Sequence, residues 1–330
     1  MTGLSIYLPY DLGYNPSRSR LSNTCYSFLL TIVAVSSKMQ WKYLTLALLV
    51  AHGSGQGSSG AAEEPIPPVG MYPMMRFECS QLVVDRIDPL VDPGAIPSPH
   101  LHQIVGGNSF NASMDPTTLD LPKASTCTSC TFSEDFSNYW TAVLYFRARN
   151  GTFLRVPQFV SYGLQGNGGT TVYYIPSMKK EYNVTAFRPG FRMLVGDAGL
   201  QSNSSDTKVC HRCMPATGDH QRANCAAPDA QFLPKGFCEG GIRSVITFPT
   251  CWDGKNLDSP DHKSHLAYAI GARPYGAGPT GTCPASHPIV IPQVMYEVMW
   301  DVSFLFSFFP LVLPTSHESP LCCYILMRLL

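Results

Sequence analysis

The sequence lacks the signature motifs of several large enzyme classes. It contains no Gly-x-Ser-x-Gly elbow, no His-Glu-x-x-His pair and no phosphate-cradling glycine loop, and its two Gly-x-Gly-x-x-Gly runs, at residues 55–60 and 276–281, do not stand between a strand and a helix as a dinucleotide-binding fingerprint does. These motifs place a nucleophile, two zinc ligands or a set of backbone amides where the corresponding chemistry needs them. Their absence argues against serine hydrolases, zinc peptidases and nucleotide-dependent enzymes of the usual kinds.

An excess of charge of one sign is also lacking. The chain has 23 basic and 23 acidic residues, its formal net charge is zero, and Lys and Arg form no cluster. A protein that binds nucleic acid needs a basic face to engage the phosphates. We therefore expect no nucleic-acid partner.

Helical periodicity and internal repeats are missing as well. Between residues 75 and 291, short apolar runs alternate with turn residues, and the whole chain holds 27 Gly and 28 Pro. This pattern predicts a mainly β protein: a single domain folded as an antiparallel β-sandwich or jelly roll, with long disulfide-braced loops. The expected strands are residues 82–84, 142–146, 171–175, 192–195, 244–248 and 290–299.

The N-terminal region predicts export. Lys42, an apolar run at residues 43–51 and small residues at 53–55 together form a signal peptide that begins at Met39. Residues 1–38 are then an extension of the gene model. A signal anchor is the alternative, but neither this run nor the apolar run at residues 28–35 reaches the roughly 18 residues that span a bilayer. The Gly/Ser-rich and then Pro-rich residues 56–70 read as a linker before a domain at 71–301.

The C-terminal region changes character after Asp301. Residues 302–314 are apolar without alternation, yet Pro310 interrupts the run and about 20 apolar residues are needed for a membrane anchor. We expect no stable membrane span. Every valine codon begins with the GT of a splice donor, and Val302 stands where the composition shifts. Residues 302–330 are therefore predicted to be an aberrant tail translated from a retained intron.

The cysteines predict disulfides. Of the 12 in the chain, nine lie within residues 71–301, an odd number that leaves one thiol unpaired. Two Cys-x-x-Cys pairs, at 127/130 and 210/213, resemble zinc knuckles. The two pairs of a zinc site usually lie about 15 to 20 residues apart, much closer together than here, and export favours disulfides.

Glycosylation sequons, which predict surface loops in an exported chain, begin at Asn111, Asn150, Asn183 and Asn203.

Two groups of residues could carry chemistry. On an extended backbone, His100 and His102 share one face, where they could meet a metal or a substrate. The alternative is that both rings only bond the neighbouring turns. The second group is the loop of residues 248–268, where Asp258 and Asp261 stand with His262 and His265. Such a set suits general acid/base work or metal binding. Its alternative is a structural turn in which the carboxylates cap backbone amides.

A third group joins acids to aromatic rings. Asp135 is followed by Tyr139 and Trp140, and Trp252 and Asp253 repeat the combination in the 248–268 loop. Sugars stack on aromatic rings and bond acids through their hydroxyls, so we assign these five residues to substrate binding. The alternative is that Tyr139 and Trp140 begin a core strand.

Several stretches resemble a family of secreted fungal and actinobacterial proteins, named domain of unknown function nineteen ninety-six. They include MRFECSQLVVDRIDPLVDPG, SPHLHQIVGGNSF, CTSCTFSEDFSNYW, TVYYIP, FRPGFRMLVGD, FPTCWDGKNLDSPDHKSHLAY and CPASHPIVIPQ, and together they cover residues 71–300. The resemblance implies export and a cell-wall or polysaccharide setting, since members often occur beside carbohydrate-binding WSC modules. It implies no catalytic mechanism. Members usually continue after Val-Met-Trp-Asp with a segment containing Gly and His, and this chain departs from them there.

These observations predict an extracellular or cell-wall carbohydrate-active enzyme, a hydrolase or lyase that acts on wall glycans. Asp258 and Asp261 would be its acid/base pair, supported by His100 and His102, and it would need no cofactor. A glycosidase requires two carboxyl groups about 5 to 9.5 Å apart. One alternative is a non-enzymatic glycan-binding or wall-structural protein. Another is a copper or zinc site, with ligands His100, His102, His262 and His265.

Overall fold

The computed structural model describes most of the chain from residue 74 to residue 303. The described residues are 74–148, 150–177, 183–196, 208–217, 225, 228–235, 237–271 and 281–303, with the backbone alone at 2–6 and 327–329. The chain divides into two compact units, Met1–Cys25 with Tyr72–Leu330 and Tyr26–Met71. The second unit, which includes the expected signal peptide and linker, lies outside the described residues. The first unit contains all of the described residues.

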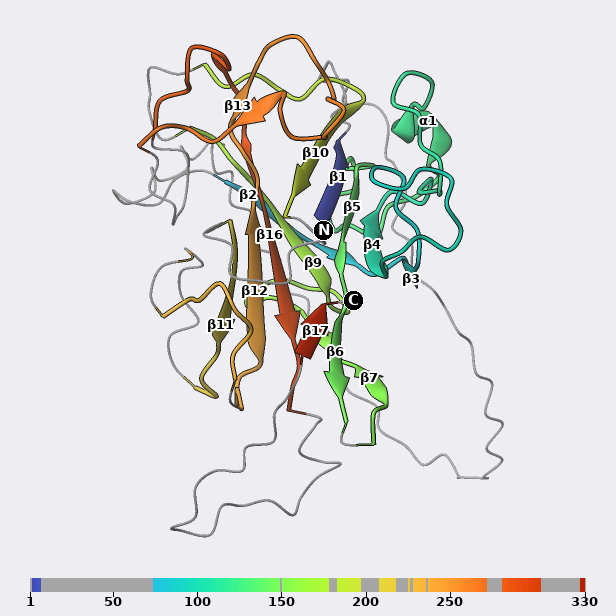
Figure 1. Cartoon of the computed structure of the whole chain (residues 1–330), viewed down its shortest axis with the longest axis vertical. Helices are drawn as coiled ribbons and strands as arrows, with labels where there is room; N and C mark the ends of the chain where they lie inside the picture. The colour runs from blue at the N-terminus through green and yellow to red at the C-terminus, as the bar shows by residue number, and fades with distance from the viewer. Residues whose placement is uncertain are drawn as a thin grey trace, which may run out of the picture. The chain divides into compact units, whose positions relative to one another are not determined.

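A six-stranded antiparallel sheet forms one layer of this unit. Its strand order is β11-β12-β16-β9-β2, and β8 pairs with the end of β16. These strands run side by side in Figure 1. Their bounds are β2 (Met75–Ser80), β8 (Gln158–Phe159), β9 (Gly169–Ile175), β11 (Val209–Cys213), β12 (Ile242–Thr247) and β16 (Gln293–Trp300).

A five-stranded antiparallel sheet forms the second layer, in the order β10-β1-β5-β4-β3. Val105 and Tyr139 of this sheet belong to the same buried apolar cluster as Val172 and Tyr296 of the six-stranded sheet. A core shared between two facing sheets is the arrangement of a β-sandwich, so the mainly β prediction is confirmed. The bounds are β1 (Thr2–Ile6), β3 (Val83–Asp85), β4 (His102–Gly106), β5 (Asn138–Ala142) and β10 (Phe191–Val195).

Two small sheets complete the regular structure, and one helix occurs among the described residues, α1 (Leu121–Ala124). One of these sheets has the strand order β14-β13-β15 and includes strands of the 248–268 loop. The other has the order β17-β6-β7. β1 and β17 come from the segments expected to be a gene-model extension and an aberrant tail, and both assignments stay predictions. The bounds are β6 (Leu144–Arg147), β7 (Phe153–Arg155), β13 (Cys251–Trp252), β14 (Leu266–Ala267), β15 (Ile289–Val290) and β17 (Met327–Leu329).

Disulfides tie the loops to the sheets. The pairs are Cys79–Cys130, Cys210–Cys225, Cys213–Cys238 and Cys251–Cys283. Both Cys-x-x-Cys pairs thus contribute to disulfides, which confirms disulfides over zinc knuckles. Cys127 is disulfide-bonded as well, so the expectation of one unpaired thiol among the nine was wrong.

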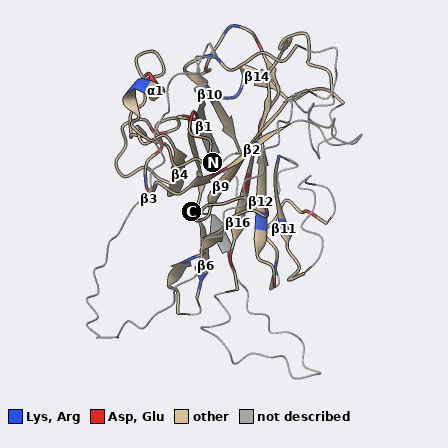
Figure 2. Ribbon diagram, turned by 180° about the vertical axis from the view of Figure 1, so that it is seen from behind, with Lys and Arg blue, Asp and Glu red and all other residues tan. Residues whose placement is uncertain are grey.

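Charged residues are spread over the described part of the molecule. Figure 2 shows a mostly tan ribbon in which short blue and red segments are separated from one another. Among the described residues, no helix has the length and apolar character needed to cross a membrane.

Candidate functional site

The 248–268 loop is held rigidly on its small sheet. β13 pairs with β14 and β15, and Cys251 is bonded to Cys283. The indole Nε1 of Trp252 donates to the carbonyl of Asn256 at 2.6 Å, and the Arg188 guanidinium lies 4.9 Å from the Trp252 ring centroid. Because Trp252 is buried, its ring serves the core of the loop and offers no face to a sugar.

Two carboxylates of this loop cap turns. Asp253 accepts the backbone N–H groups of Lys255 and Asn256. One oxygen of Asp261 accepts the N–H groups of residues 263 and 264, together with the hydroxyls of Ser259 and Ser264. These bonds, the one from the Ser264 N–H above all, hold the pKa of Asp261 well below its usual range. Asp261 therefore makes the structural turn that the sequence allowed as an alternative.

Asp258 and His262 form a partly exposed pair beside Arg192. Asp258 Oδ1 lies 2.7 Å from His262 Nδ1, and its Oδ2 lies 3.9 Å from Arg192 Nη1. The Asp258 and His262 side chains are 22% and 21% exposed. His262 adopts φ +55°, a left-handed conformation that is uncommon outside glycine. A carboxylate that orients an imidazole in this way suits a general base.

His265 is buried, and both of its ring nitrogens are bonded within the fold. Nδ1 lies 2.8 Å from Ser259 Oγ, and Nε2 lies 2.9 Å from the carbonyl oxygen of Arg192. Burial lowers the pKa of His265, which favours the neutral ring. No ring nitrogen remains for a metal, so the ring anchors the loop.

The structure does not gather the four histidines around one ion. His102 is buried on β4, with Nδ1 3.0 Å from the carbonyl of Ile87 and Nε2 3.9 Å from Asp88 Oδ2. His100 precedes the strand and is half-buried. β5 and β1 separate β4 from β10, where the 248–268 loop is attached. In the part of the chain that the structure describes, no three His, Cys, Asp or Glu side chains are grouped to hold a metal.

The residues expected to stack on sugars lie in the core. Tyr139 is 0% and Trp140 2% exposed on β5. The Tyr139 hydroxyl donates to Asp135 and lies 2.7 Å from the Tyr174 hydroxyl. Burial raises the pKa of Asp135 to about 6. These groups stabilise the interior, which is the alternative that the sequence left open.

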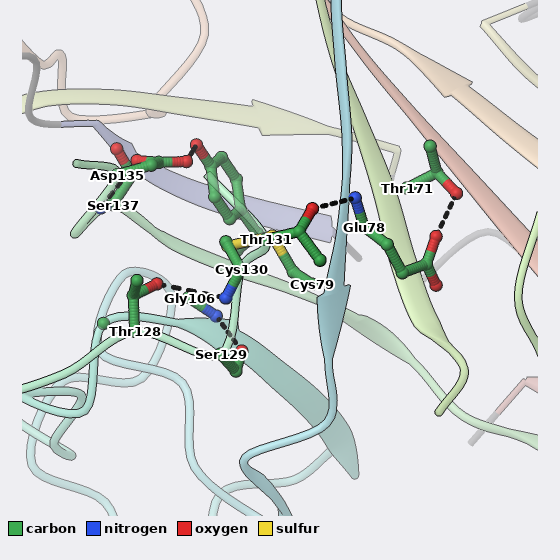
Figure 3. Close-up of a disulfide and its surroundings, with 12 residues drawn as sticks. Glu78, Cys79, Gly106, Thr128, Ser129, Cys130, Thr131, Asp135, Ser137 and Thr171 are labelled. Carbon is green, nitrogen blue, oxygen red and sulfur yellow. Dashed lines mark hydrogen bonds between the residues drawn. A yellow bond between two sulfur atoms is a disulfide. The ribbon is translucent and has the colours of Figure 1, made fainter. Parts of the chain in front are cut away.

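A second pair of carboxylates, absent from the sequence predictions, lies on the six-stranded sheet. Glu78 on β2 faces Thr171 on β9, which faces Glu297 on β16. In Figure 3 the Glu78 side chain reaches Thr171 on the side of β2 opposite Cys79. The signal that points to each glutamate in the sequence is an acidic residue inside a largely apolar strand.

Three hydrogen-bond contacts link the two carboxyl groups. Thr171 Oγ1 lies 2.5 Å from Glu78 Oε2 and 2.8 Å from Ser161 Oγ, and Ser161 Oγ lies 3.0 Å from Glu297 Oε1. Laid end to end, these distances place the terminal carboxyl oxygens within about 8 Å of each other. Each hydroxyl has one hydrogen, so all three contacts are hydrogen bonds when the pair of carboxyls holds one proton.

The surroundings place that proton on Glu78. Burial is the main cause that raises the pKa of Glu78 to about 7, and the negative charge of Glu297 adds to it. Glu297 instead accepts the Tyr173 hydroxyl at 3.1 Å, and Arg76 Nε donates to that hydroxyl at 2.7 Å. Glu78 is 2% and Glu297 9% exposed. Of the two carboxyl groups, Glu78 is thus the one whose protonated form the surroundings favour.

Comparison with protein families agrees with the resemblance seen in the sequence. The family described as Domain of unknown function (DUF1996) matches residues 88–318. The chain belongs to this family. The match includes Glu297 and the 248–268 loop, whereas Glu78 precedes it. No curated protein and no solved structure matches the chain.

Proposed function

We propose that this family member is a secreted carbohydrate-active hydrolase that cleaves glycosidic bonds in cell-wall glycans, with Glu78 and Glu297 as its acid/base pair. The observation that carries the proposal is the chain of hydroxyl contacts that keeps the two carboxyl groups at most about 8 Å apart, a limit compatible with the separation of roughly 5 to 9.5 Å used by glycosidases. The disulfides support an extracellular setting, because they form and persist in oxidising compartments.

The two glutamates would have different roles. A pair of titratable groups whose environments push their pKa values apart supplies an acid and a base at one pH. Glu78, with its pKa raised to about 7, would protonate the leaving glycosidic oxygen. Glu297 would act on the opposite side of the sugar, either on a water molecule or on the anomeric carbon. Thr171 and Ser161 lie between the two carboxyl groups and could pass a proton between them.

A lyase reaction at Asp258 and His262 is the second candidate. The observation that favours it is the partly exposed imidazole held by Asp258, with the Arg192 guanidinium beside the same carboxylate. In such a reaction the imidazole would remove the proton from the carbon next to a uronic carboxylate, the C–O bond to the glycosidic oxygen on the adjacent carbon would break, and the guanidinium would offset the carboxylate charge. The product would carry a carbon–carbon double bond, which absorbs ultraviolet light.

A glycan panel tests both candidates on the full chain. We expect reducing ends to be released without ultraviolet absorbance, and Glu78→Gln or Glu297→Gln to lower kcat by about a hundredfold or more. Glu134→Gln, at an exposed glutamate, is the matched control. An ultraviolet-absorbing product that depends on His262 would support the lyase instead. If the protein binds a glycan but releases reducing ends from none of the panel, the result would favour the non-enzymatic alternative, a glycan-binding or wall-structural protein.

A further inference from the structure

The segment between β8 and β9, residues 160–168, covers the two glutamates. Its Ser161 is buried and bonds both Glu297 and Thr171. Gly166, at φ +153°, comes so close to Glu78 that an added Cβ would lie 2.9 Å from the Glu78 Cγ. A substrate can therefore reach the pair of carboxyl groups when this segment moves.

Polar contacts attach the segment to the sheet. Arg76 Nη1 donates to the carbonyl of Tyr162 at 2.9 Å, in addition to the contacts of Ser161. No residue of 160–168 belongs to the apolar clusters found among the described residues. Gly163 and Gly168 have φ +79° and +77°, so the segment contains turns that glycine favours. Segments with few buried apolar contacts open locally at low cost in free energy.

One side chain of this segment is conspicuously exposed. Tyr162 is 83% exposed, the largest value among the exposed large hydrophobic residues in the described part of the chain. An aromatic ring in water offers an apolar face on which the C–H face of a pyranose can stack. Tyr162 directly follows Ser161, which bonds Glu297, so a sugar held on the ring would lie on the segment that covers the carboxyl pair.

We propose that residues 160–168 form a substrate-binding lid, with Tyr162 as the ring that stacks on a pyranose unit of the glycan. This inference rests on the proposed function, because it concerns the same carboxyl pair. Ser161 is the contact by which the lid closes onto Glu297. Tyr162 is then a positioning residue, which binds the sugar and takes no part in proton transfer.

Three variants of the full chain test the lid: Tyr162→Ala, Tyr162→Phe and, as a control, Phe153→Ala at an aromatic residue on β7 that is 42% exposed. On the glycan that the panel identifies, Tyr162→Ala should raise KM about tenfold with little change in kcat, the loss expected for one stacking contact. Tyr162→Phe should keep the wild-type KM because the ring remains. Phe153→Ala should also leave it unchanged.

Adsorption to insoluble chitin, β-glucan and cellulose gives a readout without turnover, and Tyr162→Ala should weaken it. Hydrolysis with an unchanged KM in Tyr162→Ala would overturn the lid and leave the proposed function standing. If the wild type adsorbs to a glycan through Tyr162 but does not hydrolyse it, the lid inference would stand and the proposed hydrolase activity would be overturned. If adsorption to all three glycans is independent of Tyr162, or is weakened equally by Phe153→Ala, the lid inference fails.

Discussion

His265 Nε2 lies 2.9 Å from the carbonyl oxygen of Arg192, and this contact joins the 248–268 loop to β10. A carbonyl oxygen only accepts, so Nε2 carries the hydrogen. In the neutral ring, Nδ1 then has a lone pair and lies 2.8 Å from Ser259 Oγ, which lies at the same distance from Asp261 Oδ1 and has one hydrogen to donate. The contact therefore fixes the tautomer of the ring and ties the loop to the five-stranded sheet.

Removal of the His265 ring should destabilise the domain. His265→Ala leaves a cavity and exposes the Arg192 carbonyl to an apolar space, so we expect a loss of about 3 kcal/mol in the free energy of unfolding. Urea unfolding measures the loss. His287→Ala, at a half-exposed histidine, should cost less than about 1 kcal/mol. Equal losses in the two variants would argue against an anchoring role for His265.

Substitution of the two aspartates of the loop should destabilise the domain by different amounts. Asp261 caps two backbone N–H groups, so Asp261→Ala should cost about 1 to 2 kcal/mol. Asp258 forms a partly exposed pair with His262, and its contact with the buried Arg192 is long at 3.9 Å, so Asp258→Ala should cost less than about 1 kcal/mol. Thermal unfolding of the two variants at one pH gives the order. The reverse order would mean that Asp258, and not Asp261, holds the turn.

The Cys251–Cys283 disulfide should contribute more to the free energy of unfolding than the Cys210–Cys225 disulfide. Cys251–Cys283 spans 32 residues and Cys210–Cys225 spans 15. In the chain-entropy account a longer closed loop gives more stabilisation, so removal of both cysteines should cost about 4 kcal/mol for the first pair and about 3 for the second. Double Cys→Ala variants, compared by urea unfolding, test the order. A larger loss for the shorter loop would mean that local packing outweighs chain entropy.

The apolar pattern was sufficient to predict three strands that are buried along their whole length. Residues 171–175, 192–195 and 290–299 fall largely in β9, β10 and β16, because these strands are buried on both faces. β4 and β11 were missed, since His102 and His211 interrupt their apolar pattern although both side chains are buried. Composition and expected export predicted that the cysteines form disulfides, but they did not predict which cysteines pair.

The carboxyl pair could not be predicted, because the register of three strands creates it. Glu78 and Glu297 are far apart in sequence, and each meets Thr171 only when β2 and β16 flank β9. In the sequence, dense local groups such as Asp258 to His265 give the stronger signal of a site. Polar residues gather there chiefly to build turns, as Asp261 shows.

The pH dependence of stability should reveal Glu78. Burial raises its pKa from 4.5 to about 7, so between these values the unfolded chain releases a proton that the folded chain keeps. Glu78 should therefore contribute a fall of roughly 3 kcal/mol in the free energy of unfolding as pH rises from about 4.5 to 7, and Glu78→Gln should remove that contribution. At pH 8 the variant should exceed the wild type in stability, whereas Glu134→Gln should match the wild type throughout. Parallel curves for Glu78→Gln and the wild type would place no proton on Glu78, and the assignment of Glu78 as the acid would fail with it.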